Sequence, residues 1–126
     1  MAVDALQHVN IHAADVERSR EFYVRVLGLQ VGPRPPVASF GYWLYLGGQP
    51  VIHLVQRAAD APPPGASGAI DHVAFRGIDL AATRDVLRAE GVPFREAVIP
   101  RDQSIQLFVH DPDGVKIELN FEHSQA

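Results

Sequence analysis

Apolar and polar side chains alternate along residues 6–12, LQHVNIH, so that His8 and His12 lie on one side of this stretch. A period of two predicts a strand. Apolar side chains then recur at helical spacing between Asp15 and Gly28. Asp15 is suited to cap the N-terminus of that helix, and Gly28 is suited to end it. The chain therefore begins with a strand that is followed by an amphipathic helix.

Two more strands are predicted after a Pro-rich break, GPRPP. The runs SFGYWLYL and VIHLVQ are rich in aromatic and β-branched residues, and the turn sequence GGQP separates them. Together they predict a hairpin. The following segment, ADAPPPGASGA, has the composition of a linker.

The same pattern of elements starts again after this linker. His72 minus His8 is 64, Asp79 minus Asp15 is 64, and the turn DPDG lies 64 residues beyond GGQP. The run VKIELNF matches VIHLVQ, although Glu118 minus His53 is 65. We therefore predict an α+β fold of two tandem β-α-β-β-β modules, whose curved mixed sheets surround a metal-containing cavity. Residues 1–126 form one domain, with module one at about 5–57, a linker at about 58–69 and module two at about 70–123.

Composition restricts the chemistry that this fold can carry. The chain has 126 residues, 47% of them hydrophobic, which is enough for one domain with a core, and it has no cysteine. Disulfides and thiolate metal sites are therefore excluded. The net charge is −4, without a cluster of Lys or Arg, and no apolar run has the length of a signal peptide or membrane span. We expect a cytoplasmic protein with no nucleic-acid or membrane partner.

Four residues combine into a candidate metal site. His8 and His72 occupy the same place on the first strand of each module, and His53 and Glu118 occupy the same place on the last. The alternation in module two places His72 and Glu118 on the face opposite the helix. Imidazole and carboxylate ligands suit Ni, Co, Zn, Mn or Fe(II), so one divalent metal ion per site is expected.

Each of these residues also has a simpler interpretation. A single histidine in a strand is more often packed or exposed than bound to metal, and only the repeat-related placement favours ligation. The offset of 65 leaves open which way His53 faces. His12 lies about 13 Å along the strand from His8, too far to share an ion. His110 and His123 have no partner at the repeat spacing, so we place them outside the site.

The duplicated unit, the histidine at the start of each half, VIHL and the run DPDG before KIEL resemble the vicinal oxygen chelate superfamily, from about Leu6 to Phe121. This superfamily includes glyoxalase I, extradiol dioxygenases, fosfomycin-resistance thiol transferases and methylmalonyl-CoA epimerase. The layout is most similar to bacterial glyoxalase I, whose ligands His, Glu, His, Glu fall here on His8, His53, His72 and Glu118. The histidine at position 53 departs from that pattern and leaves Glu118 as the single carboxylate.

The resemblance implies a metal-dependent lyase or isomerase of the glyoxalase type, acting on a small substrate with vicinal oxygens. Glu118 is then both a ligand and the catalytic general base. Two alternatives stay open. The chain is an extradiol-type ring-cleaving dioxygenase with His53 as an acid/base, or a metal-free small-molecule, antibiotic-binding protein. Aromatic side chains are the candidates for substrate-binding walls, namely Trp43, Tyr45, Phe94 and Phe108.

The Pro-rich linker bears on assembly. One helix covers one face of a four-stranded sheet in each predicted module, so the other face needs a partner. A stiff, extended linker favours pairing with the opposite module of a second chain. The resemblance to glyoxalase I implies the same exchange. We therefore expect a homodimer in which His8 and His53 of one chain meet His72 and Glu118 of the other, although a site within one chain stays open.

Overall fold

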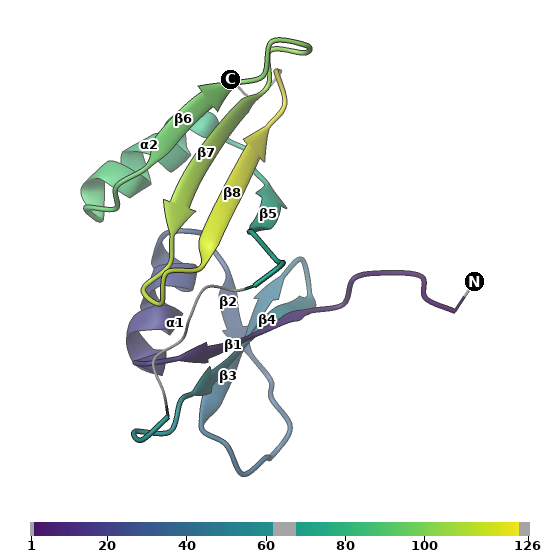
Figure 1. The fold of residues 1–126 in the computed structure, drawn as a ribbon, viewed down its shortest axis with the longest axis vertical. Helices are drawn as coiled ribbons and strands as arrows, with labels where there is room; N and C mark the ends of the chain where they lie inside the picture. Colours follow the sequence, from purple (N-terminus) through teal and green to yellow (C-terminus); the bar gives the residue numbers. More distant parts are fainter. Residues whose placement is uncertain (1, 62–67, 124–126) are drawn as a thin grey trace. The chain divides into compact units, whose positions relative to one another are not determined.

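The structure, a computed structural model, describes residues 2–61 and 68–123 (Figure 1). The chain forms two compact units, Met1–Pro62 and Pro63–Ala126. In the first unit five elements follow one another, namely β1 (Val9–Ala13), α1 (Val16–Arg25), β2 (Gln30–Gly32), β3 (Gly41–Leu46) and β4 (Gln49–Gln56). Their sheet has the order β1-β4-β3-β2, in which β1 runs parallel to β4 and the other pairs are antiparallel.

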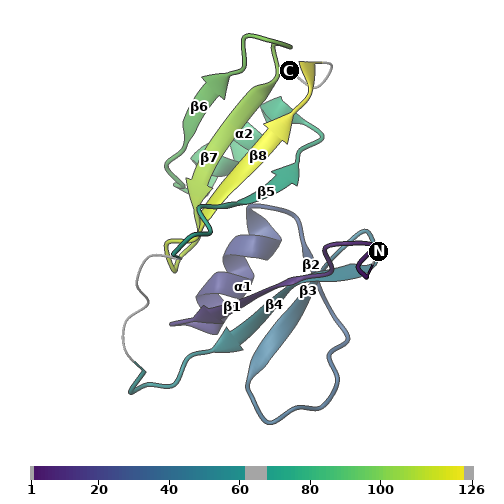
Figure 2. The same ribbon diagram turned by 45° about the vertical axis from the view of Figure 1, so that its right-hand side comes forward.

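The second unit repeats this arrangement. Its elements are β5 (Val73–Arg76), α2 (Leu80–Ala89), β6 (Arg95–Val98), β7 (Ile105–His110) and β8 (Lys116–Phe121). Strand order is β5-β8-β7-β6, again with one parallel pair, and α2 lies along one face of this sheet (Figure 2). The predicted α+β fold with two β-α-β-β-β modules is confirmed, and both sheets are open, with free edges rather than closed barrels.

The helix termini follow from the sequence. Asp15 accepts a hydrogen bond from the backbone N–H of Arg18, and Asp79 accepts one from Ala82, so each aspartate caps its helix as predicted. Gly28 adopts a left-handed φ of 79° just beyond α1, and Gly91 adopts 66° beyond α2. These glycines let the chain turn away from the C-terminal end of each helix.

The apolar core of each unit lies between its helix and its sheet. In the first unit Tyr23 of α1 is buried with Ile52 and Leu54 of β4. In the second unit the odd-numbered residues of β8 are buried together with Leu107 of β7 and Leu87 of α2. The even-numbered residues of β8 are only half-buried, so they occupy the face that the helix does not cover.

Three details differ from the predicted elements. The first strand of each module begins one residue later than His8 and His72, which immediately precede β1 and β5. Gln49 and Pro50 belong to β4, so the hairpin turn consists of Gly47 and Gly48 alone. The pairing of β3 with β4 also shifts register between Leu44 and Tyr45, a bulge that alternation alone does not reveal.

Two further expectations concern the linker between the modules and the absence of a membrane span. Much of the predicted linker, residues 62–67, lies outside the described residues. In the part of the chain that the structure covers, no helix has both the length and the apolar character to cross a membrane.

Candidate metal-binding site

The strand register shows how the two modules correspond. Asn10 of β1 pairs with His53 of β4, and Ala74 of β5 pairs with Glu118 of β8. Asn10 and Ala74 are 64 residues apart, so His53 and Glu118 occupy equivalent positions although they are 65 apart. The slip in spacing therefore arises between the first and last strands and does not turn His53 to the other face.

Aromatic residues occupy the next strand at the same level. Trp43 of β3 pairs with His53, and Phe108 of β7 pairs with Glu118. Paired residues on neighbouring strands point to the same face of a sheet. Each module thus places one potential ligand and one large aromatic side chain side by side on the face away from its helix.

Three rings form a stack in module one. The ring centroids of His8 and His53 are 3.8 Å apart at 8° between planes, and those of Trp43 and His53 are 4.0 Å apart at 12°. His53 in the middle is 8% exposed, whereas His8 is exposed. The indole and the outer imidazole together shield the central imidazole from water.

His53 is held in one orientation by its own strand. Its Nε2 lies 3.1 Å from the carbonyl oxygen of Pro50, which can only accept, so Nε2 carries the hydrogen and Nδ1 keeps the free lone pair. Burial lowers the pKa of His53, and the neighbouring His8 lowers it further. A neutral imidazole with one free nitrogen is the form that binds a metal ion.

The stack also shows what must move before both histidines of module one bind one ion. Imidazole lone pairs lie in the ring plane, and the planes of His8 and His53 are parallel and offset by their stacking distance. Two lone pairs in such planes do not converge on one point. His8, which is exposed and lies outside β1, is the ring that would have to turn before both lone pairs could meet at one ion.

In module two the corresponding pair already converges. His72 Nε2 lies 3.7 Å from Glu118 Oε1. Ligand bonds of about 2.1 Å at tetrahedral angles place two ligand atoms about 3.4 Å apart. The pair is therefore within a few tenths of an ångström of the spacing that one bound ion requires.

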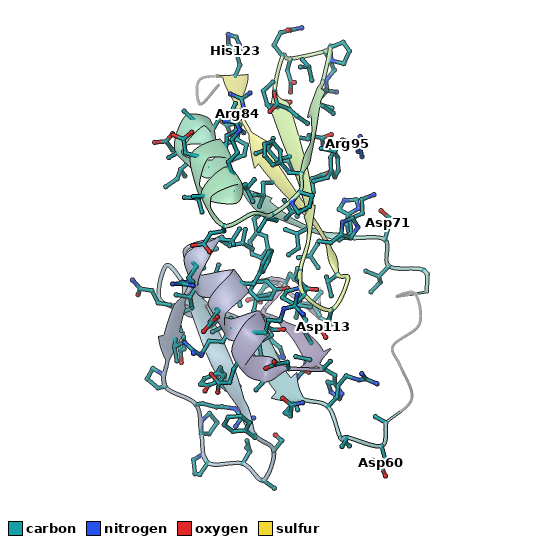
Figure 3. All side chains as sticks on the ribbon, turned by 90° about the vertical axis from the view of Figure 1, so that its left-hand side faces the viewer. Asp60, Asp71, Arg84, Arg95, Asp113 and His123 are labelled. Carbon is teal, nitrogen blue, oxygen red and sulfur yellow. The ribbon has the colours of Figure 1, made fainter. Side chains whose placement is uncertain are left out.

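Three polar side chains hold this pair in place. Asp71 Oδ2 accepts from His72 Nδ1 at 2.9 Å and from Lys116 Nζ at 3.1 Å. Asn120 Nδ2 donates to Glu118 Oε2 at 2.9 Å, which leaves Oε1 facing the imidazole. Figure 3 labels Asp71, which directly precedes His72. Alternate residues of β8, at positions 116, 118 and 120, thus build most of this half of the site.

The other predicted substrate residues have mixed surroundings. Tyr45 donates its hydroxyl hydrogen to the carbonyl of Pro33 at 2.6 Å. Phe94 lies under the guanidinium of Arg88 from α2, 5.8 Å from the ring centroid, so the structure does not bring Phe94 to the Glu118 face. Phe108 does lie on that face, where the guanidinium of Arg95 is 4.3 Å from its ring centroid.

The remaining histidines lie apart from these pairs. His12 is an exposed residue of β1 opposite Val55, and His110 is exposed at the end of β7. His123 is exposed beyond β8 (Figure 3).

The four candidate ligands are of types that suit a divalent ion, and each unit of the chain carries two of them. Among the residues that the structure describes, no group of three or more His, Asp or Glu side chains is arranged so that it could hold one metal ion. Each unit instead supplies two candidates, His8 with His53 and His72 with Glu118. Neutral imidazole and carboxylate are ligands for Zn, Ni, Co, Mn or Fe(II), so both halves have suitable chemistry.

Sequence reasoning missed the residues around the ligands. Asp71, Lys116 and Asn120 read in the sequence as ordinary polar residues of strand termini and faces. A signal was present, because Asp71 stands directly before a candidate ligand, and the other two flank Glu118 at a spacing of two residues on the same strand face.

Known proteins are similar to this chain in sequence and in fold. A family model described as Glyoxalase/Bleomycin resistance protein/Dioxygenase superfamily matches residues 5–119. "Glyoxylase I 4" of Arabidopsis thaliana is 32% identical over 121 residues, covering 91% of this chain and 69% of that protein. The "Probable lactoylglutathione lyase" of Vibrio cholerae is 30% identical over 129 residues, covering 94% of this chain and 91% of that protein.

A solved structure agrees in fold. The crystal structure of a putative glyoxalase family protein from Bacillus anthracis matches with a TM-score of 0.78 at 24% identity, covering 97% of this chain and 98% of that one. The match of the family model spans both modules, including all four candidate ligands. The chain belongs to the Glyoxalase/Bleomycin resistance protein/Dioxygenase superfamily.

Proposed function

We propose that this chain is a metal-dependent lyase or isomerase of the glyoxalase type, acting on a small substrate with two neighbouring oxygens. The observation that carries the proposal is the repeat-related pair of half-sites, in which His53 and Glu118 occupy equivalent register positions. In this proposal His8, His53, His72 and Glu118 hold one divalent ion. Relatives named glyoxylase I and lactoylglutathione lyase support the reaction class.

Glu118 is the residue proposed to move the proton. A bound divalent ion would supply Lewis acidity toward neighbouring substrate oxygens. Asn120 holds Oε2 of the carboxylate at 2.9 Å, so Oε1 is the oxygen that would bind the ion and, once it leaves the ion, would accept a proton from the carbon next to a carbonyl. Phe108, directly across from Glu118, offers an apolar surface for the substrate on the same face.

His53 sets this chain apart from a site with two carboxylates. An imidazole whose Nε2 donates to Pro50 is a neutral ligand through Nδ1 and provides no second carboxylate base. Proton removal and return therefore both fall to Glu118. We propose a substrate whose reaction needs a single base. This base either removes a proton and returns it to the substrate, or removes a proton and passes it to solvent.

The experiment that tests the proposal is elemental analysis of the purified protein, followed by two assays. Nickel, cobalt, zinc or manganese together with turnover of a thiohemiacetal of a 2-oxoaldehyde supports the lyase or isomerase. Iron with catechol-dependent oxygen uptake overturns it in favour of a ring-cleaving dioxygenase. A protein that stays inactive after reconstitution with each metal, yet binds an antibiotic tightly, overturns it in favour of a binding protein.

We also propose a homodimer as the active assembly. One face of each sheet carries the candidate ligands, and the two pairs belong to different units of the chain. In this proposal His8 and His53 of one chain join His72 and Glu118 of its partner at each of two sites. Each of the two sites is proposed to bind a small-molecule substrate.

A further inference from the structure

A carboxylate lies on the far side of His72 from Glu118. Asp71 Oδ2 is 2.9 Å from His72 Nδ1, while Glu118 Oε1 is 3.7 Å from Nε2 on the other edge of the same ring. A carboxylate that is ionised can only accept, so the hydrogen of the neutral ring is on Nδ1. Nε2 then presents its lone pair toward Glu118.

Lys116 keeps the Asp71 carboxylate in this position. The Asp71 side chain is 72% exposed and would otherwise be free to rotate, but Lys116 Nζ donates to the same oxygen at 3.1 Å. Asp71 Oδ2 thus accepts two hydrogen bonds, one from His72 and one from Lys116, which is the role of a carboxylate oxygen. Lys116 also lies over the Phe108 ring, 5.4 Å from its centroid.

The same hydrogen bond to histidine Nδ1 recurs in module one, where the acceptor is an uncharged residue. Gln7 Oε1 accepts from His8 Nδ1 at 3.0 Å, and Asp71 minus Gln7 is 64, the spacing of the repeat. Each first-strand histidine is therefore preceded by a residue whose side-chain oxygen binds its Nδ1. The two modules differ in the charge of that oxygen.

We propose that Asp71 is a positioning residue that fixes the Nδ1–H tautomer of His72 and directs its Nε2 to the metal ion, and that Gln7 fixes the same tautomer of His8. This inference rests on the proposed function, since it concerns the ligands of that site. A hydrogen bond from a ligating histidine to a carboxylate fixes the ring and raises its basicity. Because a charged acceptor is stronger than a neutral one, His72 is the stronger of the two ligands.

The test compares Asp71→Ala, which removes the acceptor, with Asp71→Asn, which keeps an acceptor oxygen but removes the charge. Asp85→Asn is the matched control, because Asp85 is an exposed carboxylate of α2 that pairs with Arg88 at 3.8 Å. The first readout is the ring ¹⁵N spectrum of His72 in metal-free protein at pH 8. The second is the dissociation constant for Zn²⁺, measured in competition with a chelator.

The wild type and Asp85→Asn should show His72 as the Nδ1–H tautomer, whereas Asp71→Ala should shift it toward Nε2–H. Zn²⁺ affinity should fall about 10–100-fold in Asp71→Ala, less in Asp71→Asn and not in the control. An unchanged tautomer in Asp71→Ala overturns the inference, and so does a changed tautomer with unchanged affinity. Because the tautomer is read without metal, the spectrum decides the role of Asp71 even if the wild type binds neither Zn²⁺ nor any other divalent ion tested, an outcome that would refute the proposed function.

Discussion

Single side chains at repeat-related positions carry the proposed chemistry, so the first prediction concerns them. His72→Ala or Glu118→Ala should lower metal content and activity together, with activity falling more than about 100-fold, because each variant removes one proposed ligand from a pair whose ligand atoms lie 3.7 Å apart. Metal is measured by elemental analysis after dialysis. His123→Ala, which changes an exposed histidine beyond β8, should leave both quantities unchanged. Full metal occupancy in both site variants would refute the four-ligand arrangement.

A second prediction separates the two leading reaction classes through His53. If this histidine is a ligand, His53→Glu should retain the ion and strengthen isomerase turnover, because it adds a second carboxylate beside the bound ion. If His53 is instead the acid/base of a dioxygenase, His53→Ala should keep its iron and lose turnover by about 10²–10⁴-fold. Metal content and both assays, measured on the two variants in parallel, distinguish these results.

The four candidate ligands could be proposed from the sequence because duplication relates them in two pairs, 64 and 65 residues apart. The sequence did not predict which nitrogen of each histidine is free. That property depends on neighbours such as the Pro50 carbonyl, which becomes an acceptor for His53 only once β4 is folded. Nor did it reveal that His8 stacks on His53, since an exposed residue before a strand has no periodicity to fix its rotamer.

At the scale of elements, the close approach of β3 to β4 supports the stacked rings of module one. A Cβ added at Gly41 would lie 1.9 Å from the carbonyl oxygen of Leu54, a backbone atom of the neighbouring strand. Gly41→Ala should therefore lower the free energy of unfolding by roughly 1–3 kcal/mol, measured by chemical denaturation. The exposed Ser39→Ala nearby serves as the control, with a small expected effect. A Gly41→Ala protein as stable as the wild type would show that β3 can move away from β4 without loss.

In module two, an ion pair connects α2 with β6 and gives a pH-dependent prediction. Arg84 donates to both carboxylate oxygens of Glu96, at 2.8 and 2.6 Å, and this holds the pKa of Glu96 below its usual range. A lowered folded-state pKa stabilises the fold above the unfolded pKa, and this stability is lost as pH falls through the folded pKa. Glu96→Gln should therefore be less stable than the wild type at pH 7, with the two converging in acid.

Denaturation midpoints between pH 7 and pH 3 measure this convergence. Glu122→Gln, which changes an exposed carboxylate beyond β8, should follow the wild type at every pH. A Glu96→Gln protein with the wild-type profile would show that the pair contributes nothing to the attachment of α2.

Elements with a local cause were predictable, and those set by pairing were not. Asp15 and Asp79 act within one turn of the chain, so their capping role is visible in the sequence. The bulge between Leu44 and Tyr45 instead reflects how β3 meets β4, and alternation does not record it. The start of β1 after His8 similarly depends on where its pairing with β4 begins, at Val9 opposite Ile52.

For the whole molecule, duplication was predictable because it repeats an entire pattern of elements, and the family match over residues 5–119 agrees with it. Which chain completes which site is a different matter. In the described residues, the strands of each unit pair with one another in a four-stranded sheet. The pairing of one unit with another therefore depends on their surfaces and on the linker, and not on the periodicity of apolar residues. Local sequence patterns do not indicate whether a site is completed within one chain or by a second chain.

The final prediction therefore tests the shared site directly, by mixing a His8→Ala chain with a Glu118→Ala chain under conditions that let dimers exchange. If each site takes His8 and His53 from one chain and His72 and Glu118 from the other, a mixed dimer collects both lesions in one site and leaves the other intact. Random exchange makes half of the dimers mixed, so activity should return to about a quarter of the wild-type value, from near zero in either variant alone. A site that closes within one chain would have one lesion in every copy, and no mixture would recover. Sedimentation of the wild type provides the companion measurement, since a monomer would exclude the exchange, and proven exchange without recovery would assign the complete site to a single chain.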